Sequence, residues 1–148
     1  MAFTNSNDYL TGRKPVPTAA GIEVVATRFD IALVAADLDL NDVGAVAILP
    51  AGHRLVEMVY DSDDLDTNGT PTIVASVGPV NAGETDLSAT WASAISASQS
   101  GTSAQPVLTP AALRYSAATD TKIGIKFTAA SATKAAGTVG LTLLYAPV

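Results

Sequence analysis

The sequence contains no cysteine, so it has neither a disulfide framework nor a thiolate metal site. No apolar run approaches the roughly 18 residues that a membrane-spanning helix needs. The first residues, MAFTNSNDYLTGRKP, are polar and lack the apolar centre of a signal peptide. These absences predict a soluble protein without a membrane partner, made and used in the cytoplasm of the cell that produces it.

Aromatic residues make up only 5% of the 148 residues, whereas glycine and proline number 11 and 8. Small side chains of this kind suit thin, closely packed strands better than a helical bundle. The net charge is −6, and residues 21–66 hold ten acidic residues against two arginines. Because no basic stripe accompanies this acidic middle, we predict no nucleic-acid partner.

Catalytic patterns are also scarce. His53 is the only histidine, and no G-x-S-x-G turn is present to position a serine nucleophile beside it. The sequence has no glycine-rich phosphate loop, and its carboxylates cluster in turns with few aromatics to form a sugar platform. We therefore predict a protein that is not an enzyme and that has no catalytic residues.

Apolar and polar residues alternate in several short segments, which is the pattern of strands that bury one face. Strands are predicted over residues 22–36, 43–49, 53–60, 70–77, 121–128 and 138–145, with the last two forming a hairpin. Residues 79–120 fit either a short helix that begins near Asp86 or a loose loop. The predicted fold is all-β: an antiparallel β-sandwich of about seven or eight strands, jelly-roll or immunoglobulin-like.

Residues 1–20 are polar and are predicted to form an extended N-terminal arm before a single sandwich domain, residues 21–148. Two interpretations of the arm remain open: a frayed terminus, or a segment that orders against a partner, since X-Pro units favour extended backbone. In the second case the fold should survive deletion of residues 2–18. The candidate partner contacts are Arg13, Lys14, Pro15, Pro17 and the sole tryptophan, Trp91, which is otherwise a core residue.

The segment from Asp64 to Gly69 matches the first half of a calcium loop, D-x-D-x-N-G. Ala75 stands where an EF-hand would place its bidentate glutamate, so only a looser calcium loop remains as an alternative. Its candidate metal ligands are Asp61, Asp64, Asp66 and Asn68. The competing interpretation is a turn with solvated aspartates, in which no cofactor is bound. Residues 37–42 echo the pattern, and the two acidic loops either share an ion or keep the surface soluble.

Two stretches of the sequence resemble capsid decoration, or cement, proteins of tailed bacteriophages. The resemblance rests on the LPAGH turn (residues 49–53), the SDDLDTNGTPT segment (residues 62–72) and the C-terminal GTVGLTLLYAP (residues 137–147). It covers about residues 22–78 and 137–147, and it transfers no individual functional residues.

The resemblance implies a virion structural protein on the capsid surface. Such a protein binds the outside of the phage head, bridges major capsid protein subunits and stabilises the lattice, as a homo-oligomer with a trimer favoured. Its partners are then the major capsid protein and further copies of itself. The alternatives are a calcium-dependent carbohydrate- or receptor-binding β-sandwich, and a tail or fibre component.

Overall fold

The computed structural model describes residues 2–148, so Met1 of the predicted arm lies outside the described residues. Residues 2–148 form eight strands, one short helix and two 3-10 turns, at residues 35–37 and 97–99. The elements are β1 (Val25–Leu33), β2 (Val43–Leu49), β3 (His53–Ser62), β4 (Val74–Pro79), β5 (Ala92–Ile95), β6 (Ser103–Ala104), α1 (Pro110–Arg114), β7 (Thr121–Ala129) and β8 (Gly137–Pro147).

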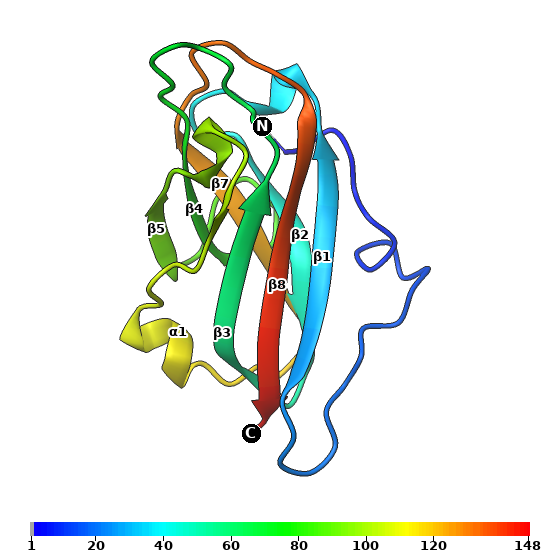
Figure 1. The fold of residues 1–148 in the computed structure, drawn as a ribbon. Coiled ribbons are helices and arrows are strands. Elements are labelled where there is room, and N and C mark those ends of the chain that lie inside the picture. The colour runs from blue at the N-terminus through cyan, green and yellow to red at the C-terminus, as the bar shows by residue number, and fades with distance from the viewer. Residues whose placement is uncertain (1) are drawn as a thin grey trace.

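The strands form two four-stranded antiparallel sheets, with the orders β1-β8-β3-β6 and β2-β7-β4-β5 (Figure 1). Strand β1 pairs with β8, β2 with β7, β3 with β6 and β4 with β5, so each pair is nested inside the previous one along the sequence. This nested pairing is a jelly roll, which decides between the two predicted sandwich types. The predicted hairpin of residues 121–128 and 138–145 is wrong, because β7 and β8 are consecutive in sequence but belong to opposite sheets.

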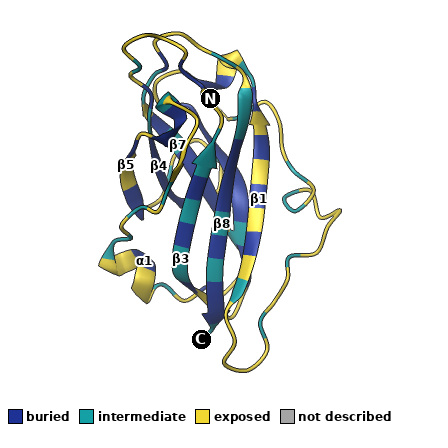
Figure 2. Cartoon of the chain, in the orientation of Figure 1, coloured by how far each residue is buried: buried dark blue, intermediate teal, exposed yellow. Residues whose placement is uncertain are grey.

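The core lies between the sheets and follows the predicted alternation. In β1, Phe29, Ile31 and Leu33 are at most 2% exposed, whereas Arg28 and Asp30 face solvent (Figure 2). The inward-facing residues of β7 and β8 are fully buried: Ile123, Ile125, Phe127, Val139, Leu141, Leu143 and Tyr145. The period of two therefore predicted correctly which face of these strands is buried.

The segment before α1 is neither the helix nor the loose loop that its sequence allowed. Residues 92–95 form β5, which pairs with β4, and residues 97–99 form a 3-10 turn. Trp91 is only 2% exposed, and its ring centroid lies 5.2 Å from that of Tyr115. Trp91 is therefore a core residue and presents no exposed surface to a partner.

Polar groups inside the described chain are hydrogen-bonded. Every buried side-chain nitrogen and oxygen of residues 2–148 has a partner. The Tyr60 hydroxyl lies 2.7 Å from the Ser98 hydroxyl, which donates to that of Ser62. Burial raises the pKa of Tyr60 to about 12, so this phenol stays neutral. Within residues 2–148, no helix is long and apolar enough to cross a membrane.

Candidate contact surfaces

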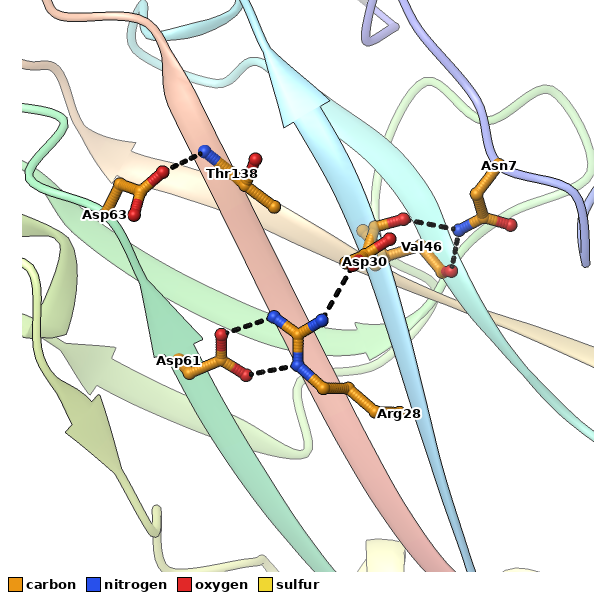
Figure 3. A network of polar contacts seen from close by, with 7 residues as sticks. All are labelled: Asn7, Arg28, Asp30, Val46, Asp61, Asp63 and Thr138. Atoms are coloured by element: carbon orange, nitrogen blue, oxygen red, sulfur yellow. Dashed lines mark hydrogen bonds and ion pairs between the residues drawn. The ribbon is translucent and has the colours of Figure 1, made fainter.

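The arm lies along the seam where the edge strands of the two sheets, β1 and β2, come together (Figure 1). The Asn7 side-chain amide donates to the carbonyl of Asp30 in β1 at 3.0 Å and to that of Val46 in β2 at 2.6 Å (Figure 3). Asn5 donates to the carbonyl of Ala32 at 2.8 Å. Two asparagine side chains thus occupy edge carbonyls that would otherwise be open to another strand.

Two aromatic rings hold the arm against the core. Phe3 fills the space beside Gly44, where any Cβ would overlap the phenyl ring, and its ring centroid lies 5.9 Å from that of Phe127. The Tyr9 ring packs edge-on against Phe29 at 4.7 Å. Phe3 and Tyr9 are therefore packed, partly buried, against the core, and deleting residues 2–18 would remove this packing. We call the surface that receives residues 2–9 the arm seat.

A connector, residues 10–24, joins the seated segment to β1 and carries four of the predicted partner contacts. Arg13, Lys14, Pro15 and Pro17 are all exposed. Arg13 lies 3.9 Å from Asp8, and the Lys14 ammonium lies 4.9 Å from the centre of the Tyr9 ring. The basic pair is thus held near the arm itself, and the exposed prolines leave their surfaces free for a partner.

The connector contacts the sandwich through a small polar latch. The Tyr145 hydroxyl donates to the carbonyl of Pro17 and lies 2.9 Å from the Thr27 hydroxyl. The His53 Nε2 accepts the Ala19 N–H at 3.0 Å, while its Nδ1 lies 2.9 Å from the Ala51 carbonyl. Both nitrogens of the only histidine are therefore engaged in positioning backbone.

Asp66 is the centre of the loops at the opposite end of the sandwich. Its carboxylate accepts backbone N–H bonds from Ala132 and Thr133 at 2.9 Å each. It also accepts N–H bonds from Thr72 at 2.8 Å and Ile73 at 3.2 Å. Burial opposes ionisation, but these N–H donors outweigh it and hold the pKa of Asp66 well below its usual range.

The structure does not bring the four candidate calcium ligands together. Asp61 binds Arg28, Asp64 accepts the backbone N–H of Asp66, and the Asn68 side-chain oxygen accepts that of Thr70. Nowhere in residues 2–148 do three acidic or histidine side chains form a group suited to a metal ion. The D-x-D-x-N-G pattern therefore serves as a series of turns whose side chains cap backbone groups.

The two acidic loops are joined through residues 130–136. Residues 132–133 bind Asp66, and the Lys134 ammonium lies 2.5 Å from a carboxylate oxygen of Asp39 in the first acidic loop. The N–H of Ser131 donates to the carbonyl of Leu38. A loop that follows β7 thus connects both acidic segments.

An ion-pair network crosses the outer face of the first sheet (Figure 3). Arg28 of β1 reaches over β8 to Asp61 of β3, donating from Nη2 at 2.6 Å and from Nε at 3.1 Å, and its Nη1 lies 2.7 Å from Asp30. The Asp61 hydrogen bonds raise the pKa of Arg28 against the opposing effect of burial. Gly140 makes this crossing possible, because a Cβ there would lie 2.5 Å from Nη2 of Arg28.

Most of the exposed large apolar side chains belong to segments at the end of the sandwich where β1 and β3 begin and β8 ends. Six large apolar side chains of residues 2–148 are exposed: Ile22, Val24, Leu40, Val107, Leu113 and Val148. All except Leu40 belong to segments toward this end: the connector, the α1 region and the C-terminus (Figure 1). Ile22 is fully exposed. We call these five side chains the apolar end.

The sequence indicated the exposed connector but missed the arm seat. Its weak signals were two aromatic residues, Phe3 and Tyr9, in an otherwise polar arm, and Gly44 in an apolar strand. Neither feature shows by itself which residue it will contact, because the contacts join residues that are far apart in the chain.

Two solved structures are similar to this chain over almost its whole length. A chain from the structure "Capsid of Ralstonia phage GP4" shares 32% sequence identity, with a TM-score of 0.78 and coverage of 97% of both chains. A chain from "Cyanophage Pam1 capsid asymmetric unit" shares 30% identity, with a TM-score of 0.71 and coverage of 98% of both chains. No protein-family model and no curated protein matches the sequence.

Proposed function

Because this chain belongs to a family of phage capsid proteins and is a virion structural protein, we propose that it is a decoration protein of the phage head. In this proposal it binds the outside of the shell, bridges major capsid protein subunits and stabilises their lattice, as a homo-oligomer with a trimer favoured. The observation that carries the proposal is the similarity of the whole chain to two capsid chains, at 97% and 98% coverage.

The proposed shell contact is the apolar end together with the connector. Burial of an exposed aliphatic side chain is favourable by about 25 cal/mol per Å² of apolar surface, and both Ile22 and Val24 of the connector are exposed. Exposed X-Pro units at Pro15 and Pro17 lower the cost of ordering the connector on a partner. Such contacts are weak in one copy and add up when copies repeat by symmetry.

The test is co-sedimentation of the purified protein with undecorated, expanded capsids of the phage that encodes it. We expect saturation at a fixed ratio related to the shell symmetry, and a higher melting temperature for the decorated shell, because a ligand that binds only the assembled state stabilises it. Absence of saturable binding would overturn the decoration role.

A pair of matched variants locates the contact. The Ile22→Ser/Val24→Ser variant should lower occupancy on the shell at least tenfold. Leu40→Ser changes an aliphatic side chain that is 58% exposed at the opposite end, and it should leave occupancy unchanged. Equal occupancy of both variants would contradict the assignment of the contact to the apolar end.

A further inference from the structure

We propose that copies placed side by side on the capsid exchange their arms, so that residues 2–9 of one copy occupy the arm seat of a neighbouring copy. This inference rests on the proposed decoration role, because the capsid supplies the fixed neighbours. The seat and its occupant are separate pieces of the chain, joined only by the connector. Exchange therefore reproduces the same contacts between two copies.

The arm seat recognises residues 2–9 through specific features. Phe3 fills the space left by Gly44, Tyr9 packs on Phe29, and the Asn7 amide joins one carbonyl from each sheet. Thr4 adds two hydrogen bonds to the buried carboxylate of Asp37, each of 2.9 Å. An arm from another copy meets these requirements, because it has the same sequence.

The connector is much longer than closure on its own sandwich requires. Tyr9 packs on Phe29, and β1 begins only four residues earlier, at Val25, which is about 13 Å along a strand. Residues 15–24, which follow the turn that is hydrogen-bonded to residues 7–9, can span about 33 Å when extended. The connector therefore bulges away from the sandwich as a loop, which passes beyond the start of β1 (Figure 1). The spare length lets the arm reach a neighbouring seat.

Little holds the connector in its closed path. Residues 11–14 form a turn that is hydrogen-bonded to residues 7–9 of the arm. Beyond this turn, the connector is held by the partly buried side chain of Val16 and by the hydrogen bonds to Pro17 and Ala19. Gly12 and Gly21 have φ angles of 77° and 69°, a region that glycine enters without steric cost, so the path bends at two points. Extending the connector toward a neighbour gives up this latch and the packing of Val16, and it retains the contacts that residues 2–9 make in the seat.

The distance between copies decides whether an arm occupies the seat of its own copy or that of a neighbouring copy. In dilute solution the arm closes on its own seat, because the connector keeps the two at high effective concentration. On the shell, a neighbouring seat within reach of the connector is present at a similar effective concentration, so it competes with the arm's own seat. Exchange then links adjacent copies, so that one copy leaves the shell only when the arms on both sides are released.

The absence of cysteine in the natural chain allows a clean cross-linking test. Asn5→Cys and Ala32→Cys place thiols at two exposed positions that the Asn5–Ala32 hydrogen bond joins in the seat. The two single variants are mixed in equal amounts, bound to undecorated capsids and treated with a short bis-maleimide. We expect covalent dimers on capsids at a yield at least ten times that of the same mixture free in solution.

Three controls identify the source of the dimers. The double variant Asn5→Cys/Ala32→Cys, in dilute solution, should cross-link within one chain, which shows that the thiols are reactive and the seat is formed. Pairing Asn5→Cys with Gln105→Cys, an exposed position outside the seat, should give no dimers above the solution level. Adding Phe3→Ala to the Asn5→Cys chain should lower the dimer yield several-fold, whereas surface proximity alone would leave it unchanged.

The outcomes separate the two proposals. Normal binding to capsids without dimers above the solution level, while the double variant still cross-links, would overturn arm exchange and leave the decoration role intact. Dimers that persist unchanged with Phe3→Ala would also overturn exchange. Failure of the unmodified chain to bind capsids would overturn the decoration role and, with it, the exchange that depends on it.

Discussion

The two ends of the sandwich meet their surroundings in opposite ways. At the end with Asp66, the buried Asp66 carboxylate ties its own loop to residues 132–133, and Lys134 pairs with Asp39 of a third loop. At the other end, a long connector is held by a small latch, and aliphatic side chains such as Ile22 face solvent. At the first end the polar groups bond to other groups of the same molecule, whereas at the second end apolar side chains remain exposed to solvent.

This difference shows where stability and recognition reside in a structural protein. The carboxylate-centred end supplies a rigid frame, because its side chains are already satisfied and gain little from a partner. The apolar end contributes little to the stability of the fold, but covering it with a partner makes the free energy of binding more favourable. The predictions below test this separation, beginning with the largest expected loss of stability.

Asp66→Asn should cause the largest loss, about 3 kcal/mol in the free energy of unfolding. The amide removes the negative charge and one acceptor from a site where five backbone N–H groups converge, leaving donors buried without a partner. Chemical denaturation of the variant measures the loss. Asp64→Asn is the matched control: this side chain is exposed, and we expect a change below about 1 kcal/mol. Equal losses would refute a special role for Asp66.

The same site gives the frame an acid dependence. Because the folded-state pKa of Asp66 is depressed, its contribution to stability is present above the pKa of the unfolded chain and disappears as pH falls toward the folded-state value. Denaturation curves should therefore show falling stability below about pH 4, and Asp66→Asn should flatten this dependence. A variant as acid-sensitive as the natural chain would assign the dependence to other carboxylates.

Phe3→Ala should cause an intermediate loss, about 2 kcal/mol, because the ring is only partly buried but fills the space beside Gly44. Hydrogen exchange should then increase at the amides of the arm and of the β1 and β2 edges, with little change around Asp66. Leu10→Ala, a half-buried position at the start of the connector, provides a comparison of similar exposure and should cost less. If hydrogen exchange increased equally at both ends of the sandwich, the arm would not protect the β1 and β2 edges specifically.

Ile22→Ser should have the smallest effect on the fold, within about 0.5 kcal/mol of the natural chain, since the side chain is fully exposed. Thermal unfolding of the free protein measures this change. A loss above 1 kcal/mol would show that the apolar end helps to hold the fold together, and the contrast between the two ends would fail.

Local pattern was a sound guide to strands and a poor guide to their partners. The alternation in β1, β7 and β8 predicted which side chains would be buried, because that depends only on the period of the strand. The same alternation cannot say which sheet a strand joins. The predicted hairpin failed for this reason: closeness in sequence favoured pairing β7 with β8, but β8 instead lies between β1 and β3.

For the candidate sites too, the local pattern predicted exposure but not the contacts between distant residues. Exposure of Arg13, Lys14, Pro15 and Pro17 follows from the polarity of the arm, so the sequence located this surface. The D-x-D-x-N-G pattern is equally compatible with a calcium loop and with a set of capped turns. The pattern could not indicate that Asp66 accepts two N–H groups from residues 132–133, more than sixty residues away.

By itself, the sequence determined the all-β class, the buried faces of the principal strands and the exposed polar connector, since each depends on the order of neighbouring residues. Only the tertiary structure decided the jelly-roll pairing, the burial of Trp91, the role of Asp66 and the seat of the arm. The physical reason is that each of these depends on groups distant in sequence that meet only after the sheets have packed, so no short segment carries the information.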